Sequence, residues 1–145
     1  MVRRPKGGTD IFLDASYAIA LAAPQDQNHA RAVALAQRIQ TEHIRLVTTR
    51  AVVLEIGNAL SKLRHREAAV KLLYALEHDP SVEVLPLSET LFRQGFDLYR
   101  QRLDKEWGLT DCISFMVMQE RGITEALTAD HHFRQAGFLA LLAGD

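Results

Sequence analysis

Four acidic residues stand far apart in the chain, at positions that a folded protein could bring together. They are Asp14, Glu55, Asp111 and Asp130. Carboxylates gathered in one cleft repel one another unless a cation lies among them. Because oxygen-only ligand sets select hard divalent ions, these acids predict a site for Mg²⁺ or Mn²⁺. Such an ion can lower the pKa of a bound water and stabilise in-line displacement at phosphorus.

Two of the acids follow short apolar segments that have the character of buried strands. Asp14 comes directly after the predicted strand over residues 11–13, and the predicted strand over residues 126–128 leads to Asp130. In open α/β sheets, ligands bind beyond the carboxyl ends of the strands. Parallel strands would therefore place both acids at one edge of the sheet.

The other two acids lie on predicted helices. In the helix over residues 51–63, Glu55 is about 60° from Val52 and about 40° from Ala59, so it flanks the apolar face. An acid in that position must be paired, protonated or bound to metal, because an isolated buried carboxylate is costly. Asp111 begins a helix over residues 111–120 that is apolar nearly all round, and the first amides of a helix favour a carboxylate.

Each acid also has a purely structural explanation. Asp14 and Asp130 would cap the helical turns that follow them, and Asp111 would be an ordinary first-turn acid. Glu55 would form a salt bridge with Arg50 or Lys62. The argument for a site therefore depends on the joint placement of the four acids at one sheet edge.

The remaining pattern alternates strands with helices, which favours a mostly parallel sheet covered on both faces. We predict a single three-layer α/β/α domain over residues 11–145, with about four to five strands, after a flexible leader over residues 1–10. The further predicted strands are 46–49, 82–87 and a last strand or tail over 138–142, and the further predicted helices are 16–23, 29–40, 67–77, 88–103 and a short turn over 132–135.

Composition limits the alternatives. The chain has 145 residues, 48% of them hydrophobic, and a formal net charge of −1, which argues against tight RNA or DNA binding by the whole surface. The single cysteine, Cys112, excludes an internal disulfide and predicts a buried thiol in a reducing, cytoplasmic compartment. No apolar stretch reaches the roughly 18 residues of a membrane span. No phosphate-binding GxxxxGK[ST] loop or zinc-type His/Cys spacing occurs.

These features together resemble the PIN-domain ribonucleases, a family that includes the VapC-type toxins of bacterial toxin–antitoxin pairs. The resemblance extends from Ile11 to Phe138, and it is strongest to stand-alone predicted nucleic-acid-binding PIN proteins. The landmarks that carry it are residues 12–16 (FLDAS), 49–58 around Glu55, 107–115 (WGLTDCISF) and 126–133 (ALTADHHF).

The resemblance implies a Rossmann-like fold, Mg²⁺- or Mn²⁺-dependent endoribonuclease activity, frequent homodimers and a possible antitoxin partner. Asp14 and Asp111 match the acids most directly linked to metal. Glu55 and Asp130 match the acids that hold metal-bound water or a second ion.

Three further residues match supporting positions in this family. Ser16 and Thr128 correspond to hydroxyl groups that support Asp14 and Asp130 by hydrogen bonds. Thr110 is expected to cap the helix and to orient Asp111.

Two other functions remain open. One is an RNA- or partner-binding PIN module without catalysis, which the near-neutral charge allows. The other is a phosphatase or phospho-acceptor with Asp14 as nucleophile. One such family has a second aspartate two residues later, where this chain has Ser16.

Several other residues receive structural interpretations. Trp107 is expected to be a packing anchor, and His131 and His132 to have local structural roles. Arg102 and Lys105 alternate with acids and predict a solvated mixed-charge surface. The helical spacing of three aromatic residues predicts core or a dimer interface, and these are Phe92, Phe96 and Tyr99.

Overall fold

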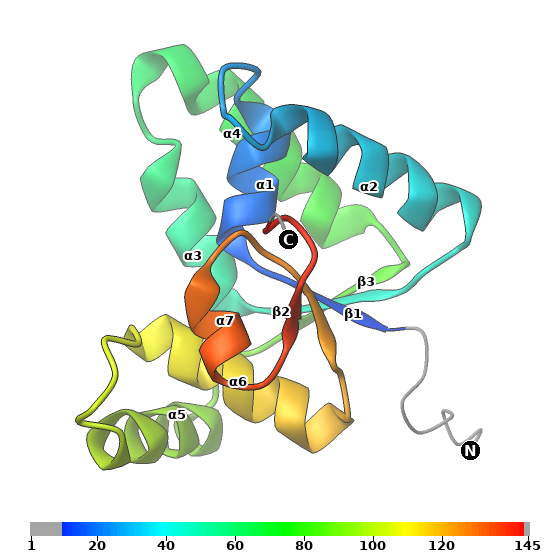
Figure 1. The fold of residues 1–145 in the computed structure, drawn as a ribbon. Coiled ribbons are helices and arrows are strands. Elements are labelled where there is room, and N and C mark those ends of the chain that lie inside the picture. Colours follow the sequence, from blue (N-terminus) through cyan, green and yellow to red (C-terminus); the bar gives the residue numbers. More distant parts are fainter. Residues whose placement is uncertain (1–9, 144–145) are drawn as a thin grey trace.

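The computed structural model describes residues 10–143, so the predicted leader lies, except for Asp10, outside the described residues. The described residues form one five-stranded parallel sheet in the order β3-β2-β1-β4-β5 (Figure 1). The strands are β1 (Ile11–Leu13), β2 (Leu46–Thr49), β3 (Val82–Leu85), β4 (Glu125–Leu127) and β5 (Leu139–Ala140).

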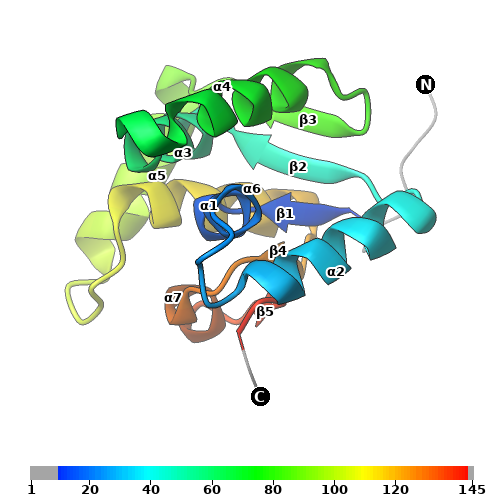
Figure 2. The ribbon, with the colours of Figure 1, turned by 90° about the horizontal axis from the view of Figure 1, so that it is seen from above.

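Helices cover both faces of the sheet, which confirms the predicted three-layer α/β/α architecture. Figure 1 shows α1, α2 and α4 above the sheet and α5 and α6 below it, and Figure 2 shows β1 and β2 pointing the same way. The helices are α1 (Ala15–Ala22), α2 (His29–Thr41), α3 (Arg50–Ala59), α4 (Leu63–His78), α5 (Glu89–Gln101), α6 (Leu109–Arg121) and α7 (His131–Gln135).

The central strand β1 is apolar and fully buried, as its sequence predicts. Its neighbour β2 is also buried, although it ends in two threonines. Thr48 donates its hydroxyl to the Leu13 carbonyl at 2.7 Å, and the Thr49 hydroxyl accepts from the Val52 amide at 3.2 Å to cap α3. The buried hydroxyls are therefore satisfied, and they fix both the end of β1 and the start of α3.

Two strands are predicted to extend further at their C-terminal ends than they do in the structure. The strand predicted over residues 82–87 stops at Leu85, because Pro86 cannot donate a ladder hydrogen bond. The strand predicted over residues 126–128 ends at Leu127, so Asp130 lies beyond the strand and begins α7. Thr128 therefore lies directly after β4, where its hydroxyl contacts Asp14.

An aromatic cluster ties α6 to α7 beneath the carboxyl edge of the sheet. Trp107 packs edge-on against Phe115 with centroids 5.0 Å apart, and Phe115 packs edge-on against Phe133 at 4.9 Å. The Trp107 indole donates to the Gln135 side chain at 2.9 Å. The interpretation of Trp107 as a packing anchor is therefore confirmed.

Three other structural interpretations can be compared with the fold. Cys112 is fully buried, and burial raises the pKa of its thiol to about 11. Arg102 and Lys105 both pair with Asp104, in agreement with a mixed-charge surface. Within residues 10–143, the structure has no helix that combines the length and the apolar character of a membrane span.

The aromatic residues of α5 are not part of the core. Phe92, Phe96 and Tyr99 are 41%, 46% and 45% exposed, and their rings stack in series along the helix. The core interpretation of these residues is therefore wrong. Only the second interpretation, an interface, remains.

Close packing of α5 on α6 gives a test of the fold. A Cβ on Gly95 would lie 3.1 Å from the Ile113 Cα and closer still to its side chain, whereas a Cβ on Gly57 would lie 3.6 Å from the Leu73 Cδ1. We expect Gly95→Ala to lower the free energy of unfolding by about 1–3 kcal/mol. Gly57→Ala is the matched control, and it should raise that free energy by up to about 1 kcal/mol through helix propensity. Urea denaturation measures the free energy of unfolding of both variants. Equal effects of the two substitutions would contradict the close packing of α5 on α6.

Candidate active site

The four acids predicted from the sequence line one open cavity of about 520 Å³ at the carboxyl edge of the sheet. They come from four separate parts of the chain: the end of β1, the middle of α3, the first turn of α6 and the start of α7. The predicted supporting residues line it too, except for Thr128, which lies directly behind Asp14. We call this cavity the acidic cleft.

Asp14 is the most buried of the four acids, with 5% of its surface exposed. Its Oδ2 accepts hydrogen bonds from the Thr128 hydroxyl at 2.7 Å and from the Ser16 hydroxyl at 3.1 Å. Burial raises the pKa of Asp14; the two hydroxyls oppose that rise, and the charge of Asp111 adds to it. Asp14 is the N-cap residue of α1, but its side chain does not form the usual capping hydrogen bond, so its main contacts are the two hydroxyls.

The two hydroxyls also join the strand ends to each other. Ser16 Oγ lies 3.2 Å from Thr128 Oγ1 and accepts from the Ala129 amide at 3.0 Å. Thr128 Oγ1 accepts from the Asp130 amide at 3.0 Å. Thr128 therefore contacts both acids, through the side chain of Asp14 and the backbone of Asp130, whereas the Ser16 hydroxyl contacts only one of the two acids, Asp14.

Asp111 lies in the first turn of α6, but the predicted cap is wrong. Gly108 is the N-cap residue, and Thr110 is the second residue of the helix. The Gly108 amide donates to Asp111 Oδ2 at 3.2 Å, so the acid itself satisfies the start of the helix. The Thr110 carbonyl accepts from the Ser114 hydroxyl at 3.0 Å. Thr110 lines the cleft without forming the predicted cap.

His132 is a site residue that the sequence interpretation missed. Its Nδ1 lies 3.0 Å from Asp111 Oδ2 and 3.3 Å from Asp130 Oδ1, so it bridges two of the acids. Burial raises the pKa of Asp111, the His132 hydrogen bond opposes that rise, and Asp130 adds to it. The sequence places His132 two residues after Asp130, which is the one sign that it could belong to the site. Its contact with Asp111 depends on how α7 packs against α6, which the sequence pattern does not show.

Asp130 combines a structural and a cleft position. Its Oδ1 accepts from the His132 amide at 2.9 Å and so caps α7. This capping agrees with the structural explanation considered from the sequence. The same side chain lines the acidic cleft, so the two explanations do not exclude each other.

Glu55 extends from α3 to the rim of the cleft, where its side chain is exposed. Partial desolvation raises the pKa of Glu55 to about 7, and the charges of the other three acids add to the rise. Arg50 pairs instead with Glu77, and no cation within residues 10–143 forms an ion pair with Glu55. The salt-bridge explanation for Glu55 is therefore wrong for the described chain.

The chemistry of the cleft fits a divalent cation. The residues that line it include a fifth acid, Glu106, and no lysine or arginine of the described chain. Three of the four central acids have raised pKa values, first because burial disfavours their charged forms and second because neighbouring carboxylates repel them. A hard cation held by carboxylate oxygens would supply the missing charge.

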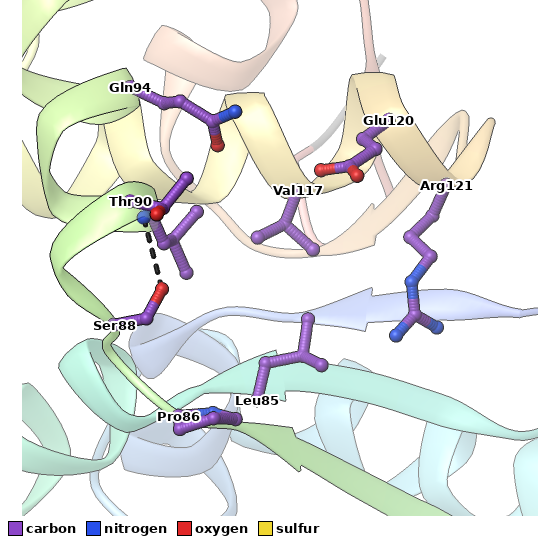
Figure 3. A pocket seen from close by; sticks show the side chains of 9 residues that line it. Leu85, Pro86, Ser88, Thr90, Gln94, Val117, Glu120 and Arg121 are labelled. Carbon is purple, nitrogen blue, oxygen red and sulfur yellow. Dashed lines mark hydrogen bonds between the residues drawn. The ribbon is translucent and has the colours of Figure 1, made fainter.

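A second cavity, of about 320 Å³, lies between the end of β3, the start of α5 and the end of α6 (Figure 3). Two of its polar groups are engaged elsewhere: the Ser88 hydroxyl caps α5, and Arg121 forms a two-pronged salt bridge with Glu83. Glu120 is the one acid among the described residues that line this cavity. The acidic cleft is therefore the better candidate for catalysis.

The fold and the cleft define a three-layer α/β domain with a carboxylate cluster at its sheet edge. The family model for the PIN domain matches residues 11–139, and the chain belongs to the PIN-domain family. No curated protein matches the chain.

Two solved structures resemble the chain. Mycobacterium tuberculosis VapC20, described as a sarcin-ricin loop cleaving toxin, is 27% identical, with a TM-score of 0.78 over 89% of this chain and 96% of VapC20. FitAcB from Neisseria gonorrhoeae is 22% identical, with a TM-score of 0.61 over 90% of this chain and 94% of its own, and it supports the fold alone.

The raised pKa of Glu55 predicts a pH-dependent stability of the metal-free protein. An ordinary glutamate has a pKa of 4.5, and Glu55 has one of about 7 in the fold, so the folded state holds an extra proton between these values. The melting temperature should therefore fall as pH rises from about 4.5 to about 7. Glu55→Gln should make this fall smaller, while Glu89→Gln, at an exposed acid of α5, should leave it unchanged. Identical profiles for all three proteins would contradict the prediction.

Proposed function

We propose that the chain is a divalent-metal-dependent endoribonuclease that uses Mg²⁺ or Mn²⁺. The observation that carries the proposal is the convergence of four acids from separate segments in one cleft whose described residues include no lysine or arginine. Membership of the PIN-domain family and the similarity to VapC20, a sarcin-ricin loop cleaving toxin, support RNA as the substrate.

In this proposal the four acids have unequal roles. Asp14 and Asp111 would be the main metal ligands, since Asp14 is held by two hydroxyls and Asp111 by Gly108 and His132. Asp130 would complete the ligand set. A bound ion would activate water and stabilise charge at phosphorus.

Glu55 would accept and release a proton during the reaction. With a pKa of about 7, its carboxyl group is suited to accept a proton near neutral pH and to release it again. Its exposed position at the rim leaves it accessible to an attacking water.

The alternatives have weaker support. Asp14 is a poor phospho-acceptor candidate, because two hydroxyls already donate to its Oδ2 and the cleft offers no described lysine or arginine to hold a phosphate. A non-catalytic RNA- or partner-binding module would not need four converging acids.

We further propose that the protein acts in the cytoplasm, as the toxin of a toxin–antitoxin pair with an antitoxin partner.

We also propose that the protein forms a homodimer through α5. The stacked rings of Phe92, Phe96 and Tyr99 form an exposed apolar stripe, which Leu103 continues beyond the end of the helix. Contiguous exposed apolar surface of this kind marks an interaction site. A second copy would cover the stripe with its own identical surface.

Cleavage of a labelled single-stranded RNA tests the catalytic proposal. Asp14→Asn and Asp111→Asn should each lower the rate at least about a hundredfold, because both remove a metal ligand. Thr128→Val, which removes a support of Asp14, should lower it by about 10- to 100-fold. Glu120→Gln, at an exposed acid at the far end of α6, should cleave like the unaltered chain. The proposal fails if the unaltered chain cleaves no RNA with either metal, or if Asp14→Asn and Asp111→Asn remain active.

Sedimentation analysis tests the dimer. Phe96→Glu places a charge in the centre of the α5 stripe and should shift the protein from dimer to monomer. Tyr74→Glu is the matched control, since Tyr74 is an exposed aromatic residue on α4, outside the stripe. A monomeric unaltered chain, or a Phe96→Glu variant that remains dimeric, would refute this interface.

A further inference from the structure

Most basic side chains of the described chain are neutralised by acids of the same chain. Nine of them lie within ion-pair distance of a carboxylate, and several pair with an acid three or four residues away in the sequence. The paired residues are Arg38, Arg45, Arg50, Lys71, Arg93, Arg100, Arg102, Lys105 and Arg121.

Within residues 10–143, Arg31 has no carboxylate partner and donates instead to the Leu142 carbonyl at 3.1 Å. Three further exposed basic residues lie close together in the sequence, within residues 62–66. Lys62, Arg64 and Arg66 are exposed, and none forms an ion pair with a carboxylate of residues 10–143. Arg64 donates to the neighbouring His65 ring at 3.2 Å, and Arg66 donates to the Ser61 carbonyl at 2.7 and 3.0 Å. We call residues 62–66 the basic turn.

The basic turn consists of Lys62, the last residue before α4, and the first turn of α4, and it follows α3, which carries Glu55. Figure 1 shows α3 running from the sheet edge to this turn, alongside α1. The helix end at Ala59 lies about 6 Å of helical rise beyond Glu55. RNA bound in the acidic cleft could continue along α3 to the basic turn, because one strand of a nucleic acid carries a phosphate every few ångströms.

Charge balance gives the turn a specific role. The acidic cleft repels RNA phosphates, and the whole chain has a net charge of −1, so attraction must come from a local positive surface. Arg102 and Lys105, which precede the cleft residue Glu106 in the chain, are already paired with Asp104. The basic turn is the place where the described chain concentrates unneutralised positive charge.

We propose that the basic turn binds the RNA backbone on one side of the scissile phosphate, through Lys62, Arg64 and Arg66. The inference rests on the proposed ribonuclease function and adds a second contact region to it. Arg66, held by the Ser61 carbonyl, would keep the turn in shape, while Lys62 and Arg64 would contact phosphates directly.

The salt dependence of RNA binding tests this proposal. Binding of a 12-nucleotide single-stranded RNA is measured by fluorescence anisotropy over a range of salt concentrations, in the full chain carrying Asp14→Asn so that no cleavage occurs. Lys62→Gln with Arg64→Gln should reduce the slope of log Kobs against log[salt] by about 1.4, or about 0.7 for each lost phosphate contact. Arg38→Gln with Arg93→Gln makes the same change in net charge at paired residues and should leave the slope unchanged.

Equal slopes for the two double variants would overturn the proposal, whether both fall or neither does. Circular dichroism should show that each variant is folded, because the four side chains substituted in addition to Asp14 are all exposed. Because the slope is read in a variant that does not cleave, it is independent of catalysis. Failure of the proposed function would instead be seen as absence of cleavage by the unaltered chain.

Discussion

The hydrogen bond from the Thr128 hydroxyl to the buried Asp14 carboxylate is the interaction on which the rest of the cleft depends. A carboxylate with 5% exposure is costly unless its oxygens are satisfied, and β1 delivers it there because the strand itself is an apolar core segment. Parallel pairing of β1 with β4 brings Thr128 alongside, and Ser16 completes the contact. The same hydroxyl of Thr128 then holds the Asp130 amide, so one buried contact positions two acids.

The other acids are held by groups that serve the fold as well. Asp111 accepts a hydrogen bond from the Gly108 amide at the start of α6, and Asp130 caps α7. The same two carboxylates therefore stabilise helix N-termini and line the cleft. Aromatic packing of Phe115 against Phe133 fixes α6 and α7 relative to each other, and it brings His132 between the two carboxylates. The accumulated negative charge is what a bound divalent ion would offset.

Much of this arrangement could be predicted from the sequence, because the apolar runs before Asp14 and Asp130 define strand ends and helical spacing defines the flank that carries Glu55. The errors have physical causes. The sequence predicts Thr110 as the cap of α6, but the N-cap residue is Gly108, whose amide donates to the Asp111 carboxylate. His132 contacts Asp111 only through tertiary packing, which local patterns do not encode. For Phe96, helical spacing is the same in a core and on an interface, so periodicity alone could not distinguish them.

Anomalous diffraction from crystals soaked in Mn²⁺ tests the central claim most directly, because it locates the ion without reference to activity. We predict an anomalous peak in the acidic cleft between Asp14 and Asp111, and its loss in crystals of Asp14→Asn. A cleft that stays empty while Mn²⁺ binds elsewhere, or a peak that survives the loss of the Asp14 carboxylate, would contradict the account.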